Sequence, residues 1–255
     1  MTRRYIAALC FFGMLSSTSP TWAETQVEQN IETRVTVALR VPQAEAQKRL
    51  PAPWQVNPIA SGPSKEANLL LIFRDRSLNL DGEGMPVTGG AERGAIIIIP
   101  AKDTQTGETA MYVVRVFTPK LQSIPGSYNN AVLATVRYEH SIKASDLDFG
   151  IGNDIWEIRD KGGGAIYFDI QYQREAPKQL KSESKTHGGP EPNFFRIYRA
   201  DQSMDFVKSI PASIDRIKNY KLHVTMKELD TLFDGSEQLV SITVIPWYIR
   251  QAFLP

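Results

Sequence analysis

The stretch Val136–Asp146 (VRYEHSIKASD) gathers side chains that could carry out covalent or acid–base chemistry. An uncharged lysine amine attacks carbonyl groups to form Schiff bases, so Lys143 is the candidate catalytic residue. If the stretch is helical, Glu139 lies one turn before Lys143, and a carboxylate at that spacing favours the protonated ammonium. The spacing leaves two readings of Lys143: a nucleophile whose pKa is lowered by burial, or a solvated residue at a helix end.

A guanidinium inside an apolar strand is the candidate for holding a ligand. Arg115 in MYVVRVF shares a strand face with Met111, Val113 and Phe117 if the strand is regular. It could point into a cavity and hold a carboxylate through two parallel hydrogen bonds, or it could cross the outer surface among polar neighbours. Arg137 and Glu139 are interpreted as an ion pair at a cavity floor. The predicted ligand-binding set is Arg115, Tyr128, Arg137, Glu139 and His140.

Other chemistries find little support in the spacing of residues. The histidines His140, His187 and His223 lie far apart, and a metal site needs several converging ligands, so we predict no metal. No GxSxG motif is present, and the glycines of DKGGGA precede a strand rather than a helix, as in a hairpin turn. We expect no cofactor.

The first 23 residues have the layout of a secretory signal peptide. Arg3 and Arg4 precede an apolar run that is too short to span a bilayer, and Thr21-Trp22-Ala23 predicts cleavage after Ala23. Cleavage removes Cys10, the single cysteine, so the mature chain has no disulfide or thiol nucleophile. We therefore expect a periplasmic or secreted protein with no membrane span after signal removal.

Charge limits the partners of the mature chain. Losing two arginines takes the formal net charge from +1 to −1, whereas nucleic-acid binding normally requires an excess of basic residues. We predict a small-molecule ligand and no nucleic acid. The sequence is compatible with a homo-oligomer but does not define one.

Hydrophobic periodicity predicts a mainly β fold with a few helices (α+β). Two stretches have the composition of helices: Pro42–Leu50, and Asn130–Ala144, which contains the stretch described first. We predict one domain over 24–255. Eight runs rich in β-branched and aromatic residues predict strands at Arg34–Val41, Asn68–Phe73, Gly94–Ile99, Ala110–Phe117, Ala165–Tyr172, Asn193–Tyr198, Lys221–Met226 and Gln238–Ile245.

The order of these elements resembles that of acetoacetate decarboxylase-like proteins. In that family a first strand, a short helix and an LP-x-P turn follow one another, as do VTVALRV, AEAQKRL and LPAPWQV here. Further along, NLLLIFRD, AVLATVRYEHSIK, GGGAIYFDIQYQRE and PNFFRIYR resemble successive segments of the family. The resemblance runs from about Arg34 to the C-terminus and implies a cone-shaped antiparallel β-barrel that encloses a cavity.

The resemblance also implies a chemistry from which this sequence departs. The family's decarboxylases form a Schiff base on the second of two adjacent lysines, but Ala144 follows Lys143 here. Their strand glutamate has no counterpart between Gly94 and Ala101. We therefore predict no ordinary acetoacetate decarboxylase activity. The sequence predicts a protein that binds, with or without transforming, a small carbonyl- or carboxylate-bearing molecule; the alternative is a non-catalytic carrier of a lipid or other apolar ligand. Catalysis, if present, would be a lyase-like Schiff-base reaction at Lys143.

Overall fold

The computed structural model describes residues 24–87, 92–121, 130–189 and 193–255. Long strands dominate this part of the chain, and all of them join one sheet. In chain order the elements are β1 (Thr25–Arg40), α1 (Gln43–Gln47), β2 (Trp54–Val56), β3 (Leu69–Asp81), β4 (Glu92–Asp103), β5 (Thr109–Thr118), β6 (Ala131–Lys143), β7 (Ile151–Asp160), β8 (Ala165–Gln173), β9 (Lys178–Gly188), β10 (Phe195–Ser209), β11 (Ile214–Asp215), β12 (Ile217–Val224), η2 (Lys227–Leu229) and β13 (Gln238–Leu254).

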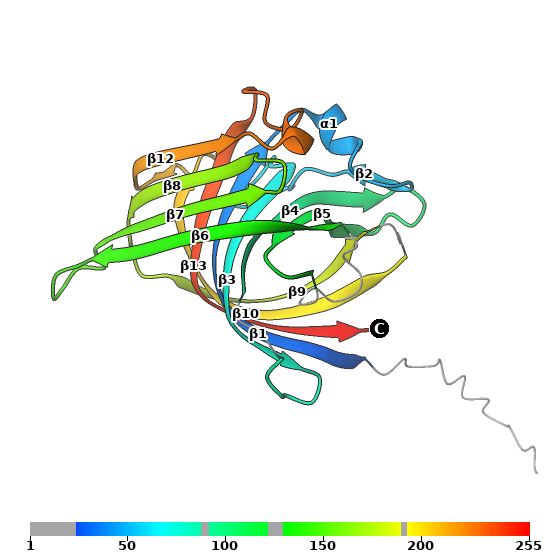
Figure 1. Cartoon of the computed structure of the whole chain (residues 1–255), viewed down its shortest axis with the longest axis horizontal. Coiled ribbons are helices and arrows are strands. Elements are labelled where there is room, and N and C mark those ends of the chain that lie inside the picture. Colours follow the sequence, from blue (N-terminus) through cyan, green and yellow to red (C-terminus); the bar gives the residue numbers. More distant parts are fainter. Residues whose placement is uncertain (1–23, 88–91, 122–129, 190–192) are drawn as a thin grey trace, which may run out of the picture.

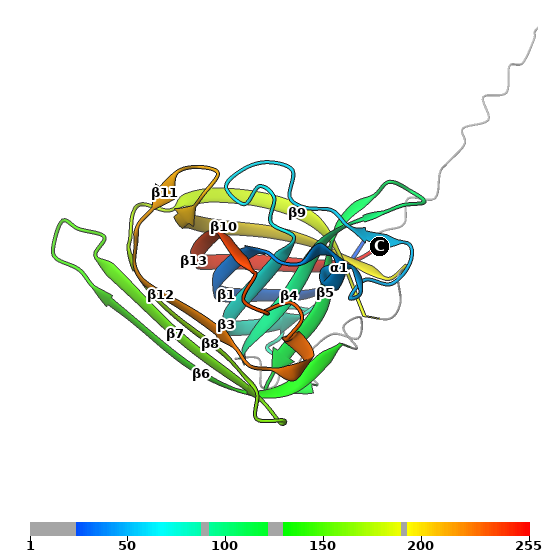
Figure 2. The same cartoon turned by 90° about the horizontal axis from the view of Figure 1, so that it is seen from above.

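Seven strands form a closed ring. Their order is β5-β9-β10-β13-β1-β3-β4, and β4 pairs back with β5. The neighbours are antiparallel except for β5 and β9, which are joined by a short parallel pairing from Met111↔Thr186 to Val113↔Gly188. Figure 2 looks at these strands from above. A closed ring leaves neither β4 nor β9 with a fully open edge, and unpaired edges are where sheets aggregate.

Four further strands extend the sheet beyond the ring. β6 leaves β5 through a short parallel pairing from Val116↔Ala131 to Thr118↔Leu133, and β7, β8 and β12 follow in antiparallel order. This extension bends so that it lies beside β1, β3 and β13 (Figures 1 and 2). The helices α1 and η2 lie together at one end of the molecule (Figure 1).

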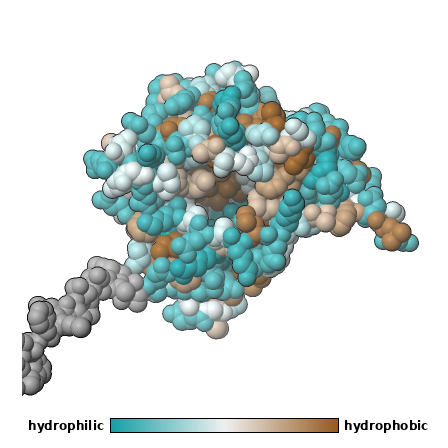
Figure 3. All heavy atoms as spheres, turned by 180° about the vertical axis from the view of Figure 1, so that it is seen from behind, coloured by the Kyte–Doolittle hydropathy of each residue, from teal (hydrophilic) through white to brown (hydrophobic). Residues whose placement is uncertain are grey.

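Alternation along the strands divides the apolar side chains between two cores. On β3, Phe73 faces the extension, where its ring stacks on Phe168 at 4.7 Å and lies 5.6 Å from Trp156. Ile72 points the other way, into the ring, and packs with Ile96, Val113 and Val116 in a second cluster. Figure 3 shows the face opposite to that seen in Figure 1. This face is mostly hydrophilic, with apolar side chains gathered in a central hollow.

The structure confirms the mainly β fold class and all eight predicted strands, and it extends most of them. The helix predicted at Pro42–Leu50 is present as α1, which is shorter than predicted and covers Gln43–Gln47. No helix among the described residues is long and apolar enough to cross a membrane. The strands close into a ring, and its predicted cone shape stays a prediction.

The helix predicted at Asn130–Ala144 is wrong, because this segment is strand β6. Its burial alternates, with Ala134, Val136 and Tyr138 turned inward and Thr135 and Arg137 exposed. β-branched residues favour that extended conformation. An unbroken antiparallel register from Ala134↔Asp160 to Lys143↔Ile151 then pairs β6 with β7, and tertiary pairing of this kind overrides a weak helix signal.

Two further long strands were not predicted. β7 (IGNDIWEIRD) buries Gly152, Asp154, Trp156 and Ile158 on one face, and the polar Asp154 among them hides the apolar alternation. β9 is polar and mostly exposed until its last three residues, so it lacks the hydrophobic pattern from which strands are recognised.

Candidate functional site

A cavity of about 380 Å³ lies inside the ring. All seven ring strands contribute to its wall, from Thr36 on β1 and Ile96 on β4 to Ser184 on β9. Volumes of this size accommodate small organic molecules. We call this space the ring cavity.

One end of the ring cavity is apolar. It is formed by side chains from β3, β4 and β5, namely Leu70, Ile72, Ile96, Ile98, Met111, Val113 and Val116. These residues are β-branched or long aliphatic ones at alternate positions, so the same pattern that favours the strands also builds the lining.

The other end holds a buried cluster of charges. Three carboxyl groups and five guanidinium groups make it up, each with a side chain no more than 9% exposed: Glu28, Glu32, Glu92, Arg34, Arg74, Arg76, Arg196 and Arg250. We call this set the arginine cluster. Most of its members alternate along β1 and β3, which turns them to the same inner face.

Close contacts join carboxylates and guanidinium groups within the cluster. Glu28 Oε1 lies 2.6 Å from Arg250 Nη2 and 3.5 Å from Arg76 Nη2. Glu32 lies 2.7 Å from Arg34 Nε and 3.4 Å from Arg76 Nε. Buried charges persist only when they are paired in this way.

A separate contact anchors the third carboxylate. Arg74 Nη2 donates to Glu92 Oε1 at 2.7 Å, and the Thr118 hydroxyl donates to the same oxygen at 2.8 Å. Strands β3, β4 and β5 therefore meet in one polar junction at the edge of the arginine cluster.

Electrostatics keep Glu28 and Glu32 ionised. Burial alone would raise the pKa of Glu28, but the charges of Arg250 and Arg76 outweigh it and lower that pKa to about 2. Burial is likewise outweighed at Glu32, where Arg34 and Arg76 hold the pKa well below its usual range. Burial together with the charge of Arg76 lowers the pKa of Arg74 to about 10. Arg74 thus stays a cation at neutral pH, although the cations Arg76 and Arg250 lie near it.

Positive charge exceeds negative charge in the cluster. Five guanidinium groups against three carboxyl groups leave an excess of two positive charges among the described members. Three nitrogens of the cavity-lining arginines have no hydrogen-bond acceptor among the described residues: Arg74 Nε, Arg76 Nη1 and Arg250 Nε. Buried donors without partners are costly. The arrangement can therefore hold an anion.

Lys143 lies away from the ring cavity. It occupies the exposed end of β6, opposite Ile151 on β7, and lines neither the ring cavity nor the cleft that contains His140. The proposed helical contact with Glu139 is also wrong, since four residues of a strand span about 13 Å.

Arg137 and Glu139 form the ion pair that was expected, but at a different place. Both side chains are more than half exposed on the outer face of β6. They do not lie at a cavity floor. In a strand, residues two apart share a face, which brings the two charges together at the surface instead.

Arg115 is turned away from the ring cavity by a β-bulge. Opposite β4, Ile97 pairs with Arg115 and Ile98 with Val113, so Val114 is an extra residue. The bulge reverses the alternation: Met111, Val113 and Val116 line the cavity, while Arg115 pairs with Glu228 of η2 at 2.5 Å. The regular strand face assumed from the sequence is therefore wrong at this point.

The other two predicted ligand-binding residues lie elsewhere. His140 lines a second cleft, between the ring and the extension, together with Tyr138 and Asp154. Tyr128 lies outside the described residues. The described residues contain no group of three or more histidine, cysteine or acidic side chains arranged to hold a metal ion.

Sequence reasoning missed the arginine cluster. The alternating polar residues of EQNIETRVT, which include Glu28, Glu32 and Arg34, gave a signal, but buried charge is rare and the part before Arg34 was not assigned to a strand. Glu92 was missed because it stands two residues before the window in which an acid was sought.

Comparison with known proteins identifies the fold. No protein-family model and no curated protein matches the sequence. An acetoacetate decarboxylase-like enzyme from Sphingomonas wittichii RW1 matches the structure with a TM-score of 0.58 and 13% identity, over 97% of this chain and 98% of that one. The enduracididine biosynthesis enzyme MppR matches with a TM-score of 0.54 and 10% identity, over 91% and 86% of the two chains. MppR structures contain pyruvate or its condensation product with imidazole 4-carboxaldehyde. The chain therefore has the acetoacetate decarboxylase-like fold.

Proposed function

We propose that this protein binds a small organic molecule bearing a carboxylate in the ring cavity. The excess of buried guanidinium groups over carboxyl groups carries the proposal, because an anionic ligand would neutralise charge that the described side chains leave uncompensated. The pyruvate bound by MppR is a carboxylate of this kind, on the same fold.

The two ends of the cavity set the orientation of such a ligand. Its carboxylate would accept hydrogen bonds from the unpaired N–H groups of Arg74, Arg76 and Arg250. Its hydrocarbon part would lie against Ile72 and Val113 at the apolar end. A wholly apolar ligand would leave the arginine donors without acceptors, which disfavours the alternative of a lipid carrier.

Arg76 is the best residue with which to test this. Its two contacts with carboxylates, 3.4 Å to Glu32 and 3.5 Å to Glu28, are longer than the 2.7 and 2.6 Å contacts that Arg34 and Arg250 make to the same groups. Removing Arg76 therefore leaves both carboxylates with a close partner.

The experiment is calorimetric titration with pyruvate, and with its neutral amide as a control ligand. Arg76→Met should weaken pyruvate binding about tenfold to a hundredfold, the loss of a charge-assisted hydrogen bond worth ~1.5–3 kcal/mol. Arg76→Lys should weaken it less, since charge is kept but the planar fork is lost. Arg159→Met, at an exposed arginine of β7, is the matched control and should bind as the unchanged protein does. Equal affinity for the amide and pyruvate, unaffected by Arg76→Met, would instead indicate an apolar carrier.

We also propose that the protein is exported and begins at Glu24. The Arg3-Arg4 pair, the apolar run and Ala23 support this, and β1 begins at Thr25, the second residue of the predicted mature chain. Intact mass after expression in a secreting bacterium should correspond to residues 24–255. A full-length product retained in the cytosol would contradict export.

A further inference from the structure

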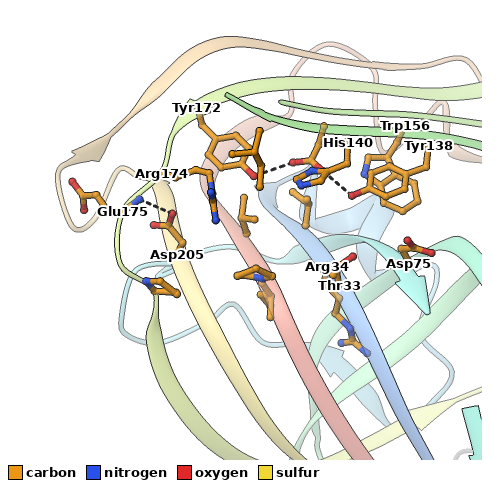
Figure 4. A pocket seen from close by; sticks show the side chains of 17 residues that line it. Thr33, Arg34, Asp75, Tyr138, His140, Trp156, Tyr172, Arg174, Glu175 and Asp205 are labelled. Atoms are coloured by element: carbon orange, nitrogen blue, oxygen red, sulfur yellow. Dashed lines mark hydrogen bonds and ion pairs between the residues drawn. The ribbon is translucent and has the colours of Figure 1, made fainter. Parts of the chain in front are cut away.

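A second cleft, of about 400 Å³, lies between the ring and the extension. Thr33 and Val35 of β1 form one side, and Tyr138, His140 and Trp156 of β6 and β7 form the other (Figure 4). Thr36 of β1 points the opposite way, into the ring cavity. The two spaces thus lie on opposite faces of β1 and have Arg34 and Ile245 in common. We call the pair formed by His140 and Asp154 the dyad, and this second space the dyad cleft.

Asp154 is the centre of the polar groups in the dyad cleft. Its side chain is 2% exposed, and three groups donate to it: Tyr138 at 2.9 Å, His140 Nδ1 at 2.9 Å and the Tyr172 hydroxyl at 3.0 Å. Gly152 makes room for this arrangement, because a Cβ there would lie 2.5 Å from the Tyr172 ring. The carboxylate is therefore held in one position by donors from β6 and β8.

The contact with Asp154 decides how His140 can react. A carboxylate accepts a hydrogen bond from Nδ1–H, so Nε2 is the nitrogen that a ligand in the cleft would meet. The His140 side chain is 40% exposed and lines the cleft. Hydrogen bonding to Asp154 raises the pKa of His140, because the carboxylate stabilises the imidazolium. This is the geometry in which an acid orients a histidine that takes up a proton.

The walls of the cleft are aromatic. The Tyr138 ring stacks on Trp156 with 3.9 Å between centroids, and Trp156, 1% exposed, has an indole Nε1 with no acceptor among the described residues. Burial and Asp154 raise the pKa of Tyr138 and Tyr172 well above the ordinary value, so both hydroxyls stay protonated and keep donating. Flat apolar walls beside one proton acceptor favour a planar ligand.

Charged groups around the cleft limit the charge that a ligand can carry when it enters. Arg174 is close enough to act electrostatically on His140 and Tyr172, and its Nη1 donates to the Phe149 carbonyl at 2.8 Å. The lining also contains three further carboxylates, Asp75, Glu175 and Asp205. Each of these three is paired with an arginine, Asp75 with Arg93 at 3.1 Å, and Glu175 and Asp205 with Arg216. Asp154 has no arginine partner among the described residues and repels a ligand that is already an anion, so a ligand that enters uncharged is preferred.

We propose that the dyad cleft binds a phenol, a planar molecule with a weakly acidic hydroxyl, and that His140 takes up its proton. The phenol O–H bond breaks, an Nε2–H bond forms, and the electron pair stays on the phenolate oxygen. The imidazolium is stabilised by Asp154, a positioning residue, and Arg174 stabilises the phenolate. The proposal does not rest on carboxylate binding in the ring cavity.

The test uses 4-nitrophenol, whose phenolate absorbs at a longer wavelength than the phenol. Equilibrium dialysis measures binding, and absorbance at a pH below the pKa of the free probe measures the ionised fraction of bound probe. The unchanged protein should bind the probe largely as phenolate. His140→Asn should abolish the phenolate signal, and His223→Asn, at an exposed histidine of β12, should retain it.

Asp154→Asn distinguishes positioning from simple support of the fold. An amide in place of the carboxylate donates to Nδ1 and so places the proton on Nε2, where it blocks uptake. The variant should bind the probe but leave it unionised. In the unchanged protein, NMR of the histidine ring nitrogens should show His140 protonated at both nitrogens when probe is added, which requires no variant to fold.

Two results would overturn the proposal. One is the absence of probe binding to the folded protein. The other is bound probe that stays neutral, or that ionises equally in His140→Asn, which would leave the dyad as a structural ion pair. Saturating pyruvate should not displace the probe; displacement would place it in the ring cavity and would equally contradict the assignment to the dyad cleft.

Discussion

Lys143 illustrates how the position of one side chain decides its chemistry. Schiff-base lysines react as uncharged amines, and burial away from water is what deprives them of the proton. Lys143 is exposed at the end of β6 and lines neither the ring cavity nor the dyad cleft. A carboxylate one helical turn away was the first argument against Schiff-base chemistry at Lys143, and it does not apply in a strand. The exposure of Lys143 is an independent argument against that chemistry.

We expect no acetoacetate decarboxylation through Lys143. Incubation with acetoacetate and borohydride, followed by peptide mass spectrometry, should show no reduced adduct on Lys143. Lysine-modified peptides from a Schiff-base decarboxylase treated in parallel provide the positive control. An adduct on Lys143, with carbon dioxide release that is lost in Lys143→Ala, would assign the protein to the Schiff-base enzymes instead.

Strand pairing positions both proposed sites, and it depends on close backbone contacts. β4 and β5 meet at Gly94, where a Cβ would lie 2.3 Å from the carbonyl oxygen of Phe117. Next to it in register lies Arg74, whose guanidinium holds Glu92. This glycine therefore lets three strands approach where the arginine cluster begins.

Gly94→Ala should destabilise the protein by about 1–3 kcal/mol, the usual cost of overpacking, because the obstructing atom belongs to the backbone and cannot rotate away. Urea unfolding measures the change. The matched control is Gly162→Ala, where the nearest atom to a new Cβ is Asp160 Oδ1 at 3.3 Å, on a side chain that can move. Equal stability of the two variants would show that β4 and β5 shift apart freely.

At the scale of the whole molecule, the arginine cluster makes the free energy of unfolding depend on pH. The pKa of Glu28 is lowered to about 2 in the folded protein from 4.5, and that of Glu32 is lowered further. A carboxyl group with a lowered pKa contributes stability above its unfolded pKa, and the contribution disappears as the pH falls towards the folded pKa. Glu28 alone contributes roughly 3 kcal/mol at neutral pH on this basis.

The free energy of unfolding should therefore fall between about pH 4.5 and about pH 2. Glu28→Gln should be less stable at neutral pH, because Arg250 and Arg76 lose a carboxylate partner, and its stability should vary less with pH in that window. Glu183→Gln, at an exposed carboxylate, should follow the unchanged protein. A Glu28→Gln profile parallel to that of the unchanged protein would contradict the assignment of the low pKa to Glu28.

The local sequence pattern was sufficient to predict much of the secondary structure of this protein. Alternating β-branched and aromatic residues predicted eight strands, and the run of good helix formers after Pro42 predicted α1. Both signals depend on the nearest neighbours in the chain, so they can be read without knowing the fold. His140 was predicted to bind a ligand, and that role stays a prediction.

Tertiary structure alone decided which residues meet. β6 is a strand because β7 pairs with it, and one extra residue at Val114 turns Arg115 out of the ring cavity. Glu28 and Arg250 are 222 residues apart, and His140 and Asp154 lie on different strands. Pairing of β1 with β13 brings the first pair into contact, and pairing of β6 with β7 places His140 directly opposite Asp154. Burial and charge pairing then set their pKa values, because both depend on atoms that are distant in the sequence and adjacent in space.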